Sequence, residues 1–130
     1  MKRVTGIGGV FLKARDPKAL NAWYARHLGI PIGEHGADFR WRDHGDPDIE
    51  GTTVWSLFPQ ESKYFDPSTA RVMINYRVED LDALLDILRK EGVTVFPKQE
   101  EEYGKFAWIM DPEGNKIELW EPPQMEPAKK

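Results

Sequence analysis

One acidic residue, Glu118, stands inside the otherwise apolar end of the stretch KIELW. Side chains alternate between the two faces of a strand, so Glu118 lies on the face opposite to Ile117 and Leu119. A carboxylate on that face can accept a proton, bind a ligand, or serve only as one half of an ion pair. Glu118 is therefore the candidate catalytic residue, and Arg77 or Lys13 would be its partner in a structural role.

The other residue types that carry chemistry form no motif. His27 stands near the end of a predicted helix, where a cation favours the helix dipole, so a structural role is expected. His35 and His44 lie in a polar, acidic stretch that lacks the spacing of a calcium loop, which predicts a solvated loop. The chain has no cysteine, and it has no glycine-rich phosphate loop, nucleophile elbow or histidine-glutamate zinc helix.

Composition limits the partners. The chain has 130 residues and a net charge of -4, without a dense basic stripe, so nucleic acid is not expected as a partner. No apolar stretch approaches the roughly 20 residues that cross a bilayer, and no secretory signal is present, so we expect no membrane partner. The lack of cysteine favours a reducing cytoplasm. We expect a single domain over residues 1–122, followed by a flexible tail over residues 123–130 that is rich in proline and polar residues.

Two segments of the chain repeat one pattern. The strand-like run IGGVFLKA is followed by a helix that Asp16 caps and Gly29 ends, and VMINYRV is followed by a helix that Asp80 caps and Gly92 ends. The two aspartates are 64 residues apart and the two glycines 63. A period this long predicts a duplicated module rather than a solenoid.

Further strand-like runs follow each predicted helix. They are DFRWR and TTVWSLF in the first half, and TVFP, KFAWIM and NKIELW in the second. The turn DPEGN joins the last two as a hairpin, since its proline fixes φ and its glycine tolerates a positive φ. The charged stretch KQEEEYGK is expected to be a surface loop.

The repeated pattern, the helix RVEDLDALLDILRKEGV and above all MDPEGNKIELWEP closely resemble the glyoxalase/bleomycin-resistance/dioxygenase family, the vicinal oxygen chelate superfamily. The resemblance implies an α+β fold of two βαβββ modules, about residues 5–60 and 71–122. Their strands would form a curled, barrel-like mixed sheet around a cleft, with the helices on the outer side. It also implies a homodimer and a small-molecule ligand.

The resemblance further implies four metal-ligand positions, two in each module. In this chain they hold Gly9, Ser56, Met73 and Glu118, of which only the glutamate is a strong ligand. A divalent cation needs several oxygen or nitrogen donors to replace its hydration shell, so neither a metal nor another cofactor is expected. We therefore expect a protein that binds a small organic molecule, with or without a reaction. A metal-dependent lyase or dioxygenase, with ligands such as His35 or His44, and an antibiotic-sequestering resistance protein are the alternatives.

Alternation places a set of side chains on the face of Glu118, and the aromatic content adds others. Each aromatic residue could also be ordinary core, but five tryptophans in a chain this small favour a cleft for a flat or apolar ligand. Tyr103 is expected to fold over the cleft as part of a lid. The candidate ligand-binding residues are Phe11, Lys13, Ser56, Phe58, Met73, Asn75, Arg77, Tyr103, Trp108 and Trp120.

Overall fold

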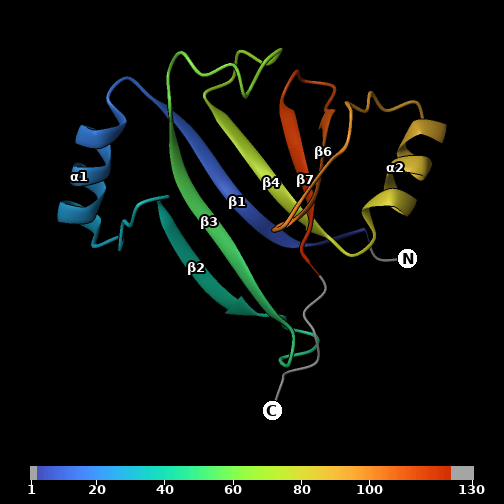
Figure 1. Ribbon diagram of the computed structural model, residues 1–130, viewed down its shortest axis with the longest axis horizontal. Coiled ribbons are helices and arrows are strands. Elements are labelled where there is room, and N and C mark those ends of the chain that lie inside the picture. Colours follow the sequence, from blue (N-terminus) through green and yellow to red (C-terminus); the bar gives the residue numbers. More distant parts are fainter. Residues whose placement is uncertain (1–2, 124–130) are drawn as a thin grey trace.

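The computed structural model describes residues 3–123, which form one sheet flanked by two helices (Figure 1). In chain order the elements are β1 (Val4–Ala14), α1 (Pro17–Leu28), β2 (Ala37–Arg42), β3 (Glu50–Pro59), β4 (Val72–Val78), α2 (Leu81–Lys90), β5 (Gln99–Glu101), β6 (Gly104–Met110) and β7 (Lys116–Glu121). The strands lie in the order β2-β3-β1-β4-β7-β6-β5. The pairs β1/β3 and β4/β7 are parallel and the other neighbours are antiparallel, so the sheet is mixed.

The α+β prediction is confirmed, but the sheet does not close. Within the described residues β2 and β5 each pair on one side only and form the two edges, so the mixed sheet is open. Helix α1 packs near β1 and β3, and α2 packs near β6 and β7, which leaves one helix beside each half of the sheet (Figure 1).

Both helices begin and end where the sequence predicts. The Asp16 carboxylate accepts a hydrogen bond from the Ala19 amide (3.1 Å), and α1 ends at Gly29, whose φ is 67°. The Asp80 carboxylate accepts in the same way from the Ala83 amide (3.1 Å). Helix α2 ends before Gly92, whose φ is 85°.

The two helices differ in how many of their side chains are buried. Four leucines of α2, at positions 81, 84, 85 and 88, are buried against residues of β4, β6 and β7 that include Val78, Ala107 and Leu119. Helix α1 buries no residue, and its Trp23 is 50% exposed. The α2 half therefore has the larger hydrophobic core.

The predicted runs DFRWR, TTVWSLF, KFAWIM and NKIELW form β2, β3, β6 and β7, but the βαβββ pattern and the run TVFP are not matched in full. Residues 29–36 are rich in glycine and proline, which disfavour a strand, so only β2 and β3 follow α1 instead of three strands. In the second half TVFP is not a strand: Val95 makes one isolated bridge to Ile109, and Pro97 lacks the N–H that would continue the pairing. The third strand is β5, inside the stretch predicted as a surface loop.

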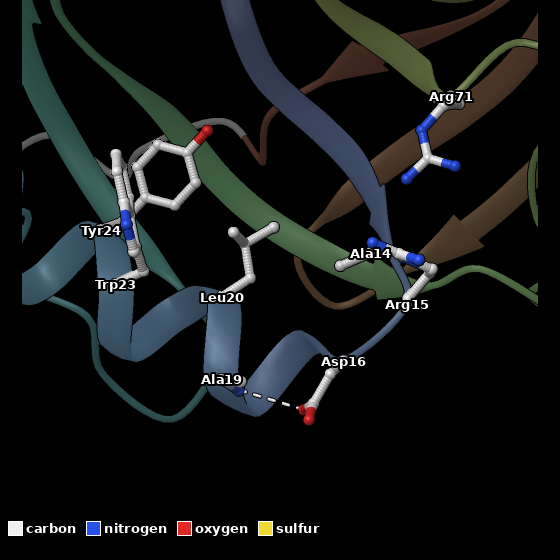
Figure 2. Close-up of a pocket in the computed structure, with 8 residues that line it drawn as sticks. All are labelled: Ala14, Arg15, Asp16, Ala19, Leu20, Trp23, Tyr24 and Arg71. Atoms are coloured by element: carbon white, nitrogen blue, oxygen red, sulfur yellow. Dashed lines mark hydrogen bonds between the residues drawn. The ribbon is translucent and has the colours of Figure 1, made fainter.

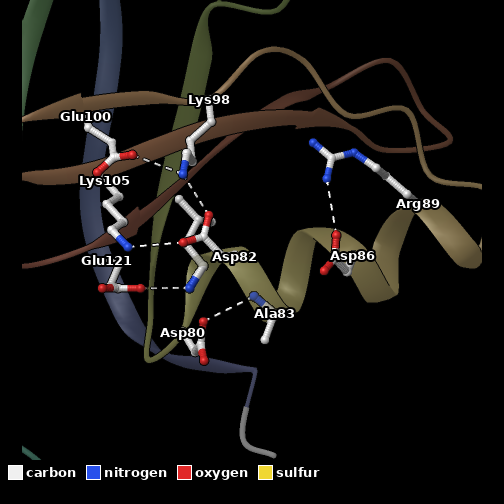
Figure 3. Close-up of polar contacts among 10 residues, drawn as sticks. Asp80, Asp82, Ala83, Asp86, Arg89, Lys98, Glu100, Lys105 and Glu121 are labelled. Atoms are coloured by element: carbon white, nitrogen blue, oxygen red, sulfur yellow. Dashed lines mark hydrogen bonds and ion pairs between the residues drawn. The ribbon is translucent and has the colours of Figure 1, made fainter.

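Charged side chains attach β5 and β6 to α2. Lys98 and Lys105 both donate to the Asp82 carboxylate, at 2.8 and 3.0 Å, and Lys98 also pairs with Glu100 at 3.1 Å (Figure 3). Glu121 of β7 accepts from the first amide of α2, that of Leu81, at 2.8 Å. The lysines lower the pKa of Asp82 below its ordinary value by hydrogen bonding.

Candidate functional site

Glu118 lies in the middle of β7 and is 3% exposed. Its register partners are Asn75 on β4 and Trp108 on β6, so the three side chains share one face of the sheet. Ile117 and Leu119 pack on the other face with the α2 core, which confirms the predicted alternation. The fold thus places the carboxylate away from both helices.

Three neutral groups donate hydrogen bonds to this carboxylate. Asn75 Nδ2 donates to Oε2 at 2.5 Å, and Trp108 Nε1 donates to Oε1 at 3.0 Å. The Tyr64 hydroxyl also donates to Oε1. Donors to a buried carboxylate offset part of its lost hydration, which explains how Glu118 remains in place with no cationic partner among residues 3–123.

Tyr64 belongs to the connection between β3 and β4. Tyr64 is 38% exposed, whereas the next residue, Phe65, is fully buried and fixes the connection against the sheet. The Tyr64 ring stacks on Phe58 with centroids 5.4 Å apart and meets Trp108 edge-on at 6.0 Å. Burial first, and then the charge of Glu118, raise the pKa of Tyr64 far above its ordinary value. Tyr64 is therefore a neutral, partly exposed hydrogen-bond donor to Glu118.

Lys116, at the start of β7, contacts the residues around Glu118. Its Nζ donates to the backbone carbonyl of Tyr64 at 2.8 Å. It also lies over the rings of Tyr64, Phe96 and Trp108, at 5.7, 5.7 and 5.6 Å from their centroids, and we name these three rings the aromatic cage. Burial lowers the pKa of Lys116, and the charge of Glu118 opposes that shift.

Most of the predicted ligand-binding residues meet on this face. Phe65, Met73 and Trp108 form a buried cluster, and Phe11, Phe58, Phe96 and Phe106 pack against it. Lys13 lies over the Phe65 ring, with Nζ 5.1 Å from the centroid. Ser56 is partly buried on β3, where its register partner is Phe11. The face is thus aromatic, with one carboxylate at its centre.

Asn75 leaves one polar atom without a partner. Its side chain is 3% exposed, and among the described residues its Oδ1 accepts no hydrogen bond. The Oδ1 atom lies so close to Gly8 that a Cβ there would overlap it. Glycine at position 8 is therefore required for this orientation of the amide.

Arg77 does not pair with Glu118, so the predicted ion pair is wrong. Its Nη1 donates to the carbonyl of Glu50 at 2.9 Å, and its guanidinium lies 5.7 Å from the centroid of the Trp41 ring. The strand register explains the difference, because Arg77 is opposite Trp120, two residues beyond the position that Asn75 occupies opposite Glu118.

Tyr103 and Trp120 lie at the β5 side of this face. Tyr103 is 62% exposed, and its ring is 5.5 Å from that of Phe106. Trp120 Nε1 donates to the Tyr103 carbonyl at 2.8 Å, and the Trp120 ring stacks on Phe106 at 6.2 Å. The loop side chain that bonds to Glu118 is that of Tyr64, which no motif or repeat in the sequence indicated. The available signal was the aromatic pair in SKYFDP, within a connection that the repeat does not match.

A pocket of about 520 Å³ lies elsewhere, between the start of α1 and the end of β1 (Figure 2). It is lined by Ala14, Arg15, Asp16, Ala19, Leu20, Trp23, Tyr24 and Arg71. None of the predicted site residues lines it, and the Asp16 carboxylate is already engaged as the helix cap. This pocket thus lies at α1, whereas Glu118 is buried in the sheet face.

Neither helix in the described part of the chain is long and apolar enough to cross a membrane.

Among curated proteins, the chain is 27% identical to the uncharacterized protein YraH of Bacillus subtilis (strain 168). The match extends over 118 residues and covers 84% of this chain and 92% of that protein.

Solved structures share the fold. The methylmalonyl-CoA epimerase of Mycobacterium tuberculosis is 23% identical, with a TM-score of 0.61 over 94% of this chain and 91% of that chain. A variant of the Streptomyces coelicolor methylmalonyl-CoA epimerase, in complex with 2-nitronate-propionyl-CoA, is 18% identical, with a TM-score of 0.70 over 96% and 99% of the two chains. A glyoxalase/bleomycin resistance protein/dioxygenase superfamily member from Vibrio splendidus 12B01 is 12% identical, with a TM-score of 0.59 over 88% and 97%. The model of the glyoxalase-like domain matches residues 9–120, so the chain belongs to the glyoxalase-like domain family.

Proposed function

We propose that this protein binds a small organic molecule on the sheet face that carries Glu118. The observation that carries the proposal is a carboxylate only 3% exposed, held by three neutral donors within an aromatic cluster. Taking a carboxylate out of water costs free energy that neutral donors offset only in part. A ligand that brings a hydrogen-bond donor or a positive charge to Glu118 would compensate that cost more fully.

Tyr64 is the proposed entrance to this site. Of the three donors to Glu118 in the described part of the chain, its hydroxyl comes from a connection, whereas Asn75 and Trp108 are fixed on β4 and β6. A partly exposed side chain on a connection moves at a lower cost than a strand residue. Movement of Tyr64 would open the path by which a ligand reaches Glu118, and its ring would close again over the bound ligand.

The proposal includes no metal ion, because the residues at the four implied positions do not fit one. Gly9 offers no side chain, Met73 is 1% exposed within the aromatic cluster, and both oxygens of Glu118 already accept hydrogen bonds. Ser56 would add a single hydroxyl. Within residues 3–123, no three His, Cys, Asp or Glu side chains gather into a group that would hold a metal ion, which includes His35 and His44 of the metal-dependent alternative.

Two versions of the proposal remain to be separated. In the enzyme version Glu118 accepts a proton from a carbon next to a carbonyl group, and the epimerases of the same fold suggest this reaction type. In the binding version the protein sequesters its ligand without turnover, as the resistance branch of the superfamily would. Exchange of solvent deuterium into a bound carbonyl compound would support the enzyme, and tight binding without exchange would support the sequestering protein.

We also propose that the two halves are duplicated modules that meet at β1 and β4. The parallel pair β1/β3 in the first half corresponds to β4/β7 in the second, and β1 and β4 join the halves as antiparallel neighbours. A homodimer in the cytoplasm completes this proposal, and light scattering that finds only monomer at micromolar concentration would contradict the dimer. The predicted flexible tail lies almost wholly outside the described residues.

The deciding experiment is a thermal-shift and native mass-spectrometry screen of small organic compounds against the wild type and Glu118→Gln. The amide keeps the shape of the carboxylate, and Asn75 can rotate its unpartnered Oδ1 towards the new NH₂ group, so the variant is expected to fold. Compounds that stabilise the wild type should lose that effect in Glu118→Gln. Glu113→Gln, in the exposed turn before β7, is the matched control. Equal binding by wild type and Glu118→Gln would show that Glu118 is structural.

A further inference from the structure

We propose that the ligand of this site is an organic cation, an amine or a quaternary ammonium group, and that Lys116 occupies its position in the empty protein. The inference rests on the proposed function, since it names the chemical class that the Glu118 face would bind. Its basis is the aromatic cage, which surrounds one ammonium group of the chain itself.

The geometry of the cage is that of a cation site. Three rings from separate parts of the chain, Tyr64 before β4, Phe96 before β5 and Trp108 on β6, lie within 5.7 Å of Lys116 Nζ, measured to their centroids. A cation within about 6 Å of a ring centroid is attracted by the negative face of the ring. Three such faces around one nitrogen form a binding site for an ammonium group, whether it comes from a side chain or from a ligand.

The polar acceptor groups at the cage, like the faces of the rings, carry negative charge. The Tyr64 carbonyl accepts from Lys116 Nζ at 2.8 Å, and the Glu118 carboxylate is bound to two members of the cage through the Tyr64 hydroxyl and Trp108 Nε1. Ring faces, a carbonyl oxygen and a carboxylate all favour a positive charge and repel an anion. Rings cannot replace the oxygen ligands of a hard metal ion, so the suitable cation is an organic one.

Lys116 is suited to leave when such a ligand arrives. It stands at the first position of β7, its side chain is only partly buried, and a lysine stem reaches solvent by rotating its flexible bonds. When the stem rotates outward, the cage and the Tyr64 carbonyl lose their cation. An external organic cation therefore competes with Lys116, and removal of the lysine charge should strengthen the binding of that cation.

The test compares tetramethylammonium binding to the wild type and to Lys116→Met, followed by tryptophan fluorescence or NMR and corrected with equal concentrations of sodium chloride. Methionine keeps most of the stem and removes the charge. We expect tetramethylammonium to bind Lys116→Met roughly 5-fold or more tightly than the wild type, which is within the range of a cation–π contact released from competition. Adding Trp108→Leu should remove most of that gain.

Lys90→Met is the matched control, because Lys90 is an exposed lysine at the end of α2 and does not belong to the cage or to the Glu118 face. It should leave tetramethylammonium binding unchanged. An NMR measurement on the wild type keeps the test independent of the variants: saturating tetramethylammonium should move the Lys116 methylene resonances away from their ring-shifted positions. Unchanged resonances together with equal affinity of wild type and Lys116→Met would overturn the inference. A neutral ligand that depends on Glu118 while tetramethylammonium does not bind would overturn it and leave the proposed function intact.

Discussion

Replacing Tyr64 by phenylalanine removes the hydroxyl that covers Glu118 and keeps the ring. The stacking of the ring on Phe58, at 5.4 Å, is preserved, so the change isolates the bond to the carboxylate. A hydrogen bond to a charged group contributes about 1.5–3 kcal/mol to stability. Because Tyr64 is 38% exposed, water can reach the vacated oxygen and offset part of that loss. We therefore expect Tyr64→Phe to lower the free energy of unfolding by about 1–2 kcal/mol.

Urea unfolding measures this loss as a lower midpoint with an unchanged m-value. The double variant Tyr64→Phe/Glu118→Gln completes a cycle whose coupling energy should be about 1 kcal/mol if the hydroxyl and the carboxylate interact directly. Tyr103→Phe is the control: its side chain is 62% exposed, and the described hydrogen bond of this residue involves its backbone carbonyl. Its effect should stay within about 0.5 kcal/mol. If Tyr64→Phe is as stable as the wild type, or the coupling is zero, the hydroxyl does not hold the connection over Glu118 and the proposed entrance is wrong.

Three further outcomes are expected. The raised pKa of Tyr64 stabilises the fold below the ordinary tyrosine pKa of about 10, so the wild type should lose stability above that pH more steeply than Tyr64→Phe in urea titrations. The lowered pKa of Asp82 gives the opposite dependence, a stabilisation that is present at neutral pH and lost in acid. Asp82→Asn should therefore speed hydrogen exchange of β5 at neutral pH, and Asp86→Asn should not. The difference in exchange between Asp82→Asn and the wild type should vanish as the pH falls below about 4. Leu84→Ala, which empties a buried position of α2, should cost about 3 kcal/mol in urea unfolding, whereas Leu20→Ala on the poorly buried α1 should cost about 1 kcal/mol or less.

The sequence predicted the elements whose signals are local. Asp16 and Asp80 cap their helices through the amides three residues later, and alternation assigned Glu118 to the face opposite Leu119. These features depend on short-range geometry that the order of residue types encodes directly. The α+β class was implied by the resemblance to the glyoxalase/bleomycin-resistance/dioxygenase family.

What the sequence could not predict depends on long-range pairing. Arg77 and Asn75 lie on the same strand, and only the register of β4 against β7 decides which of them stands opposite Glu118. A shift of two residues keeps every side chain on its face and changes the partner of the carboxylate, so alternation alone cannot distinguish the two. The predicted ion pair failed for this reason.

The connection between β3 and β4 shows the same limit at the site itself. It lies between the two repeated segments, so neither the repeat nor periodicity says where Tyr64 and Phe65 pack. Phe65 is fully buried in the aromatic cluster, and this anchor places the hydroxyl of its neighbour on Glu118. The donors to the carboxylate thus come from three separate parts of the chain, and each alone would leave it poorly compensated. A site assembled in this way is sensitive to the position of its one non-strand donor, so movement of Tyr64 alters both the exposure and the hydrogen bonding of Glu118 in a single step. We therefore propose that the β3–β4 connection controls ligand access to Glu118.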